Sequence, residues 1–284
     1  MKVGVSSLVA VLVFASPARA ATMGDVPLRD GDRVGASLSE AFTASPQAKA
    51  VKMLASVTTL SAAYRPRPRW TLTLDAGLSL TSYRLENQSP GSVARAGNPL
   101  LGVQLSLPIS ERLSMRVGIF AGAPLVTVPG GLTSNAAAEL ADRTATAATG
   151  QTLYWMWARN VAPLVALGRL AYRPAERVVL GVDVQPAFLV SVNRDASYVA
   201  LLATFEARVE LGVFAPGIRL ASLVTSRPRD TNDFAQAATA AFLRIDGGRA
   251  FGAVEFVSGL DGPQGPGRPD QTWWGATLTG GARF

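Results

Sequence analysis

The side chains that most enzymes use for proton transfer and metal binding are missing from this chain. It has no histidine and no cysteine among its 284 residues. Hydrolysis by a serine–histidine pair, a histidine general base and zinc sites of the common His/Cys type are therefore excluded, as is a disulfide framework. The lysines stand only at positions 2, 49 and 52, with no partner serine at a recognisable spacing. The sequence predicts a protein that is not an enzyme.

Pairs of carboxylates are the next groups that could bind a metal ion. Asp230 and Asp233 lie in one segment with a loop-like composition, and Asp261 and Asp270 lie in another. Calcium takes such oxygen ligands, but neither spacing matches a calcium-binding loop, and solvated loop acids are the simpler interpretation. We therefore expect no metal and no other cofactor.

Most of the remaining charge recurs on the polar face of segments in which apolar and polar residues alternate. An unpaired buried charge is costly, whereas a paired or hydrated one is tolerated. The near-balance of signs indicates cross-strand ion pairs in a wet or narrow interior, centred on Glu206-x-Arg208-x-Glu210 opposite Arg219. Ion pairs that only hold the shape of the protein are the favoured interpretation, and a constriction that filters solutes by charge is the alternative. The candidates are Lys52, Asp75, Arg116, Arg169, Asp183, Glu206, Arg208, Glu210, Arg219, Arg244 and Glu255.

The alternation itself predicts half-buried β-strands. In the clearest one, Leu72, Leu74, Leu78 and Leu80 share a face opposite Thr73, Asp75 and Ser79. Pro186 cannot donate to a strand ladder, so we expect a bulge there or a strand that ends before it. Residues 33–42 are the weakest candidate, with a helical plug or a flexible leader as the alternative. The predicted strands are 33–42, 50–63, 69–82, 99–109, 112–127, 160–173, 176–190, 198–214, 216–226, 236–246, 249–259 and 272–284.

The connections between these strands alternate between tight and long. Outer-membrane barrels are built with short turns on one side and long loops on the other, and they show their apolar strand face to lipid. A soluble sandwich would bury that face instead and has little reason to segregate its connections. The Ala/Thr-rich residues 135–150 could form a short helix in the longest loop. The tight connections are 65–68, 110–111, 174–175, 215–216 and 247–248, and the long ones are about 43–49, 83–98, 128–159, 191–197, 227–235 and 260–271.

Aromatic residues gather near both sets of connections, as expected for girdles at two membrane interfaces. Those near the tight turns are Tyr64, Trp70, Tyr172 and Phe284, and those near the long loops are Tyr83, Tyr198, Trp273 and Trp274. The alternative is that they cap the core of a soluble sandwich.

The last strand alternates in twos back from a terminal Phe284. It resembles the closing strand of bacterial outer-membrane β-barrels, whose final aromatic residue is read by the barrel-assembly machinery. Size and even strand number resemble small substrate-specific channels and barrel transporters of Gram-negative outer membranes. The segment from Gly97 to Gly102 resembles one in hydrophobic-solute channels, but it is too short to carry over a binding residue.

The first residues have the pattern of a secretory signal. An apolar run from Val3 to Phe14 precedes Ala18-Arg-Ala20, and it is too short to span a bilayer as a helix. This pattern predicts a signal peptide at 1–20 with cleavage after Ala20, a leader at 21–32 and a barrel at 33–284. A buried N-terminal strand or helix is the alternative.

The net charge of +7 comes almost entirely from scattered arginines, and 48% of the residues are hydrophobic. Scattered charge on an exported chain does not favour a nucleic-acid partner. The sequence therefore predicts an all-β fold, a transmembrane antiparallel up-and-down barrel of about twelve strands in the outer membrane. Its expected partners are outer-membrane lipid, the assembly machinery and small solutes. We expect a passive pore, or alternatively a structural or surface-interaction barrel with a closed, salt-bridged lumen.

Overall fold

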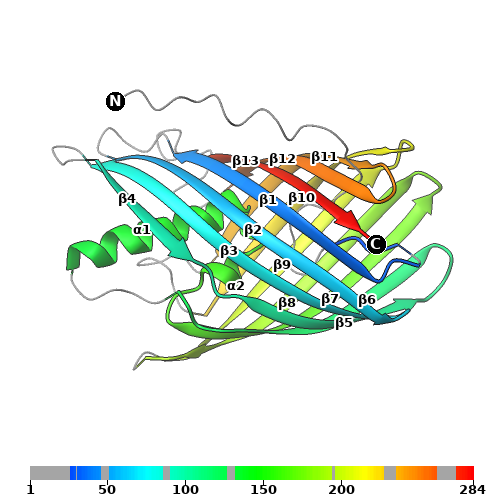
Figure 1. Ribbon diagram of the computed structural model, residues 1–284, viewed down its shortest axis with the longest axis horizontal. Helices are drawn as coiled ribbons and strands as arrows, with labels where there is room; N and C mark the ends of the chain where they lie inside the picture. The colour runs from blue at the N-terminus through cyan, green and yellow to red at the C-terminus, as the bar shows by residue number, and fades with distance from the viewer. Residues whose placement is uncertain are drawn as a thin grey trace.

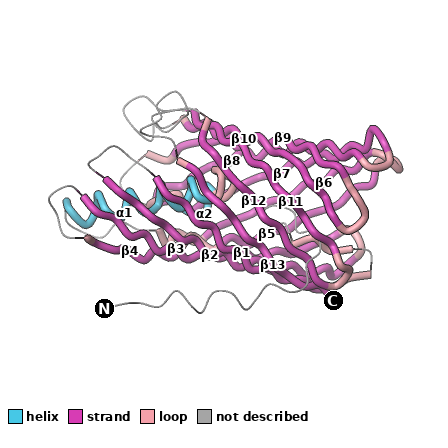
Figure 2. Tube along the Cα trace, turned by 90° about the horizontal axis from the view of Figure 1, so that it is seen from above, coloured by secondary structure: helices cyan, strands magenta, loops and turns pink. Residues whose placement is uncertain are grey.

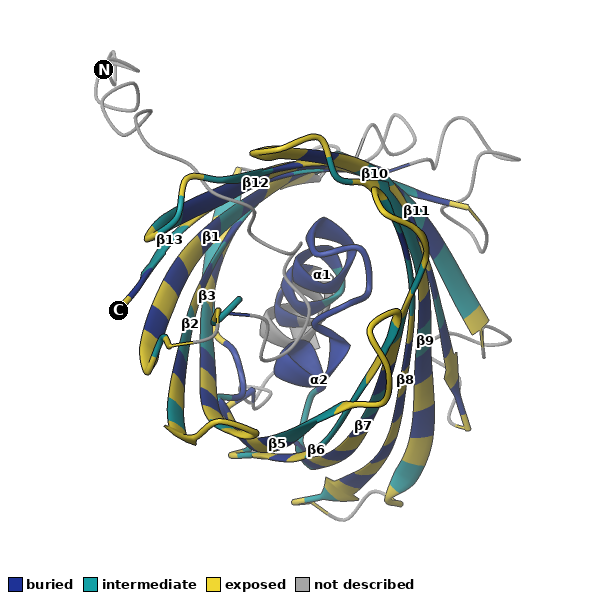
Figure 3. Ribbon diagram, turned by 90° about the vertical axis from the view of Figure 1, so that its right-hand side faces the viewer, coloured by how far each residue is buried: buried dark blue, intermediate teal, exposed yellow. Residues whose placement is uncertain are grey.

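The computed structural model describes residues 26–29, 31–45, 51–85, 90–126, 132–193, 196–226, 235–260 and 273–284. They form a closed barrel of antiparallel strands with two helices inside it (Figure 1, Figure 3). Consecutive strands pair along the chain, and β1 closes the barrel by pairing with β13. The strands are β1 (Val34–Ser45), β2 (Val51–Arg67), β3 (Trp70–Leu85), β4 (Gly91–Ala96), β5 (Leu100–Pro108), β6 (Leu113–Gly122), β7 (Val161–Ala175), β8 (Val178–Ser191), β9 (Tyr198–Val209), β10 (Phe214–Thr225), β11 (Ala235–Asp246), β12 (Ala250–Gly259) and β13 (Trp274–Arg283).

The thirteen described strands occupy twelve positions around the barrel, because β4 and β5 share one. β5 pairs with residues 70–75 of β3, and β4 pairs with residues 78–83 of the same strand. Gly97, Asn98 and Pro99 interrupt the shared position between them. The prediction of an up-and-down barrel of about twelve strands is confirmed, and residues 33–42 belong to a strand rather than to a plug.

Alternation sorts the side chains of each strand onto two faces. On β3, Leu74 and Leu78 are exposed on the outside, whereas Thr73 and Ser79 point inward and are buried. The same division runs round the barrel, with buried rows of alanine, threonine and charged residues inside and exposed leucine, valine and phenylalanine outside. An apolar exterior around a polar interior is the arrangement of a membrane barrel rather than of a soluble sandwich.

Between β6 and β7 the chain turns into the barrel. It forms α1 (Leu132–Ala148) and α2 (Tyr154–Trp157), which lie inside the ring of strands near the end that carries the long loops (Figure 2, Figure 3). The expected helix at 135–150 is therefore present, and α2 is an addition. No helix in the described ranges has the length and apolar character to cross a membrane.

Several strand ends differ from the sequence-based prediction. β6 stops at Gly122 rather than at residue 127, and β9 stops at Val209 rather than at residue 214, because Glu210 to Val213 form the turn into β10. The long loop predicted at 83–98 contains β4.

The expectation for Pro186 is wrong. β8 continues past it to Ser191, and the register between β7 and β8 is unchanged from Gly168↔Val184 to Val165↔Ala187. The strand therefore accommodates the missing amide donor without a bulge.

The predicted signal peptide lies outside the described residues, as do the acidic loop residues Asp230, Asp233, Asp261 and Asp270. Of the predicted leader, Val26 is buried in a cluster with the inward residues Ala63, Phe251 and Ala253. Arg65 donates to the carbonyl oxygen of Arg29 over 2.7 Å. These leader residues thus pack at the end of the barrel that carries the short turns.

Candidate functional site: the barrel interior

The charged residues predicted for the polar face point into the barrel. Asp75, Arg169, Asp183, Arg219, Arg244 and Glu255 are buried, and Arg116, Glu206, Arg208 and Glu210 are half-buried. Arg116 donates to Gln104. The side chain of Lys52 lies outside what the structure describes. The barrel thereby brings residues from eight strands into one enclosed space.

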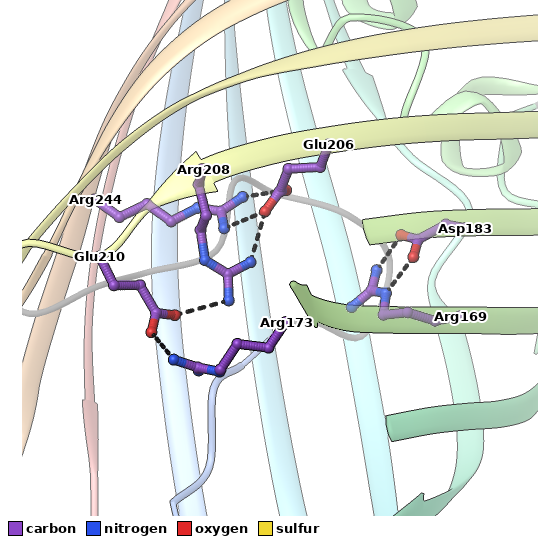
Figure 4. Close-up of polar contacts among 7 residues, drawn as sticks. All are labelled: Arg169, Arg173, Asp183, Glu206, Arg208, Glu210 and Arg244. Atoms are coloured by element: carbon purple, nitrogen blue, oxygen red, sulfur yellow. Dashed lines mark hydrogen bonds and ion pairs between the residues drawn. The ribbon is translucent and has the colours of Figure 1, made fainter. Parts of the chain in front are cut away.

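Two sets of ion pairs occupy the half of the lumen near the short turns (Figure 4). Arg169 and Asp183, on neighbouring strands, form a bidentate pair with Nε–Oδ1 at 2.6 Å. A longer chain of pairs runs from Arg173 to Glu210, Arg208, Glu206 and Arg244, with N–O distances between 2.5 and 3.1 Å. Each carboxylate in this chain is therefore shared by two arginines, which compensates its burial.

Arg219 does not join Glu206, although the two are direct partners in the β9–β10 register. Its guanidinium pairs with Glu255 on β12, while Arg244 on β11 reaches over β10 to Glu206. Inward side chains converge in the lumen, so long arginines bond to carboxylates two strands away. Register alone therefore gives the wrong partner for Arg219.

The other half of the lumen is filled by the inward-folded segment 132–158, here called the plug. Tyr154, Trp155, Met156 and Trp157 are all buried. They pack in one cluster with inward apolar residues of the wall, among them Phe120, Val165, Leu189 and Leu202. Trp155 donates its indole N–H to Gln185 over 2.9 Å. The lumen is therefore closed by side chains on the long-loop side.

Asn98 fastens the plug to the interruption between β4 and β5. Its side-chain amide donates to the carbonyl oxygens of Ala158 (2.7 Å) and Trp155 (3.3 Å), and its side-chain oxygen accepts the N–H of Val126 at 2.8 Å. Its backbone N–H donates to Met156 at 2.7 Å. Asn98 is fully buried, and its bonds hold the C-terminal end of the plug and the end of the segment that precedes it at Val126.

Two glycines make room for the plug at the same place. A Cβ on Gly77 would lie 2.3 Å from the sulfur of Met156, and a Cβ on Gly97 would lie 2.5 Å from its Cγ. Farther out, Asp142 of α1 pairs with Arg95 on β4 at 3.1 Å and with Arg159 at 3.7 Å. The two glycines, the side-chain amide of Asn98 and the ion pair between Asp142 and Arg95 together determine the position of the plug against the wall.

Several polar groups of the barrel interior have no partner. The hydroxyls of Thr73, Ser79 and Thr81 on the inward face of β3 and the indole N–H of Trp157 in the plug are buried without a hydrogen-bond partner in the described structure. An unsatisfied buried polar group costs about 1–3 kcal/mol. The plug therefore leaves one of its own donors unsatisfied.

Phe284 lies where the barrel closes. Its carbonyl oxygen accepts the N–H groups of Arg33 and Val34 at 2.7 and 2.9 Å, and its side chain is 71% exposed. The neighbouring Arg283 is buried and bonds to Asp246 and to the carbonyl oxygens of Gly248 and Pro27. An exposed terminal aromatic is compatible with the predicted assembly signal, which stays a prediction.

Sequence reasoning missed several residues of this interior. Asn98 stands in a motif that the sequence analysis singles out, but its role depends on the plug. No pattern in the sequence distinguishes Arg95, Asp142 or Arg173 from the other charged residues. Residues that join a loop to a strand by buried polar contacts do not recur with a regular period, so the alternation pattern cannot reveal them.

Neither a protein-family model nor a curated protein sequence matches this chain. Its fold is similar to that of solved structures. An outer-membrane channel from Pseudomonas putida F1 matches with a TM-score of 0.61 and 11% identity, over 92% of this chain and 98% of that one. The NanC porin matches with a TM-score of 0.53 and 8% identity, over 88% of this chain and 99% of that one. The chain therefore has the fold of outer-membrane β-barrel channels and porins, as its sequence predicts.

Proposed function

We propose that this chain is a passive channel of the outer membrane whose lumen is closed by a displaceable plug. The observation that carries the proposal is the segment 132–158, which folds into a closed barrel and is fastened to the wall at Asn98. The apolar exterior supports a place in the membrane. The similar structures are described as an outer-membrane channel and a porin.

The energetics of the plug support displacement rather than permanent closure. The indole N–H of Trp157 in the plug and three hydroxyls on the inward face of β3 are unsatisfied, and water that enters the lumen in place of the plug would hydrate such groups. The fastening at Asn98 opposes that movement. A two-state element requires a difference of only a few kcal/mol between its closed and open positions, and a small number of fastening bonds is consistent with such a difference.

The lumen beyond the plug favours a channel over a purely structural barrel. Glu206, Arg208 and Glu210 are only half-buried, so water reaches the charged half from the short-turn end. The described part of the chain holds no cluster of three or more residues suited to a metal. The charged lining makes ions or small polar solutes the expected cargo.

Conductance in planar bilayers tests the proposal. Purified wild-type protein should show low conductance with rare openings, and Asn98→Ala should open far more often because the plug loses the two side-chain bonds from Asn98 to Trp155 and Ala158. Asn193→Ala is the matched control, since Asn193 lies in an exposed turn and bonds to Ser191. If Asn98→Ala remains as closed as the control while folding normally, the plug does not gate the lumen.

A further inference from the structure

Arginine recurs at one position around the short-turn end of the barrel. Six strands begin at this end, namely β1, β3, β6, β8, β10 and β12 (Figure 1). The residue just before the strand is arginine in five of them and Val213 in the sixth. Each of these six residues accepts a backbone N–H from the adjacent strand at its carbonyl oxygen, over 2.7–2.9 Å, so the six positions are equivalent. The arginines, here called the mouth ring, are Arg33, Arg69, Arg112, Arg177 and Arg249.

The strand register places the mouth ring on the lumen side of the wall. Directly opposite residues of an antiparallel pair share a face of the sheet. The residues opposite the ring, in its own order, are Arg65, Ser106, Arg173, Glu210 and Arg283. Arg173 and Glu210 belong to the ion-pair chain inside the lumen, and Arg283 is buried. Ala63 and Gln104, two residues before the other two, are buried inside the barrel. The ring therefore surrounds the mouth that faces the viewer in Figure 3.

The mouth ring has no counter-charge bound to it. All five side chains are exposed, and in the described structure none of them makes a hydrogen bond or an ion pair. Glu111 and Glu176 are exposed too, one residue before Arg112 and Arg177, but they do not pair with them. Three ring residues lie opposite another arginine, an arrangement of like charges that is destabilising. The buried arginines of the lumen, by contrast, each bond to a carboxylate. The ring thus presents guanidinium groups that are open to solutes.

We propose that the mouth ring makes the channel select anions, namely small solutes that carry a carboxylate or phosphate group. The inference rests on the proposed function, because a filter acts only on a pore that opens. The planar guanidinium group binds carboxylate and phosphate oxygens through two parallel N–H groups. Like charges around one mouth raise the local concentration of anions and lower that of cations. The charges deeper in the lumen are paired and nearly cancel, so the ring determines the sign of the selectivity.

Reversal potentials in a gradient of potassium chloride test the ring, with chloride and potassium as the probes. The full-length Asn98→Ala variant supplies the open channels. Its chloride-to-potassium permeability ratio should exceed one. Adding Arg112→Gln, Arg177→Gln and Arg249→Gln should lower this ratio by about threefold or more at about 0.1 M salt, because the mouth loses three of its five charges. At about 1 M salt the difference should nearly vanish, since the Debye length is then about 3 Å.

Single changes in the same background separate the ring from the total charge of the protein. Val213→Arg fills the sixth position, which is 49% exposed, and should raise the permeability ratio. Arg67→Gln is the matched control for Arg69→Gln. Arg67 is exposed in the same turn, but it lies opposite the outward Trp70. Both changes remove one charge, and Arg67→Gln should lower the ratio much less. Heat-modifiable gel mobility shows that each variant is folded.

Three results would overturn the inference while leaving the channel intact. They are open channels that prefer potassium, a permeability ratio that the triple change leaves unaltered, and equal effects of Arg67→Gln and Arg69→Gln. The last result would mean that the arginines act from outside the wall, as expected for binding to phospholipid phosphates. Absence of any conductance from both the wild type and Asn98→Ala would overturn the channel proposal together with the inference, so the two failures are distinguishable.

Discussion

At the residue scale, the environment of a charge decides its cost more than its type does. Arg244 is 2% exposed and bonds to both oxygens of Glu206, whereas the side chain of Arg173 is 42% exposed at the end of the same chain of pairs. Removing one partner of a buried pair leaves an uncompensated charge. Removing an exposed partner leaves a charge that water can solvate.

We therefore expect Arg244→Ala to destabilise the barrel by about 3–5 kcal/mol and Arg173→Ala by about 0–1 kcal/mol. Urea unfolding in lipid vesicles, followed by heat-modifiable gel mobility, measures both. Equal losses for the two variants would mean that the inner chain of ion pairs is hydrated along its whole length.

The outward face gives a second prediction at this scale. Leu74→Arg, near the middle of the spanning part of β3, should cost about 2–4 kcal/mol. Val209→Arg should cost about 0–1 kcal/mol, because Val209 faces outward at the last residue of β9, beside a short turn. The same unfolding measurement applies, and a cost that does not depend on depth would contradict the placement of the bilayer.

At the element scale, strands could be predicted and the plug could not. Alternation is a local signal with a period of two, so all the strand positions except β4 follow from it. α1 is rich in alanine and threonine, and its C-terminal half is buried although it is weakly hydrophobic. Nothing in its composition separates a helix inside the lumen from one in a loop. α2, with four residues, is too short for a periodic signal.

The ion-pair partners of the charged residues could be predicted only in part, because a partner across the lumen leaves no local signal in the sequence. The alternation of side chains along β10 places Arg219 on the inward face. Its bond to Glu255, however, depends on how far side chains reach across the lumen. Asn98 has no apolar or charged pattern around it, and its role exists only because the plug returns to the wall.

The fit between glycine and methionine gives an element-scale prediction. Gly97→Ala places a Cβ against Met156 and should loosen the plug, which raises the open fraction in bilayer recordings. Met156→Ala in the same chain should restore most of the closure because it removes the side-chain atom at 2.5 Å and leaves only the backbone oxygen at 3.2 Å to adjust. Gly168→Ala, whose Cβ would make only an ordinary contact of 3.9 Å with Val184 O, should behave as wild type. A Gly97→Ala variant that stays closed would show that the wall yields instead of the plug.

At the scale of the whole molecule, barrel and plug are separable units. The β6–β7 ladder runs to Ala121↔Leu164, and the wall is hydrogen-bonded around its circumference without any residue of the plug. The plug adds a core on the long-loop side, while ion pairs brace the other half. Closure of the pore and integrity of the wall therefore depend on different residues.

Replacing residues 128–157 by a short flexible linker should consequently leave a folded, heat-modifiable barrel with a large, permanently open conductance. Some loss of stability is expected because the apolar wall residues that face the plug become wet. A variant that fails to fold would show that the plug is needed to form the barrel and would argue against a displaceable gate.

The placement of the indole rings divides the intrinsic fluorescence of the protein into two populations. Trp70 and Trp274 are 42% and 53% exposed on the outer surface, whereas Trp155, Trp157 and Trp273 are buried inside the barrel. Brominated acyl chains should quench the exposed pair and leave the buried group bright. Iodide should reach the buried group only when the plug has moved, so Asn98→Ala should increase iodide quenching without changing quenching by the lipid. The molecule thus carries an optical readout of its own gate, without an added dye.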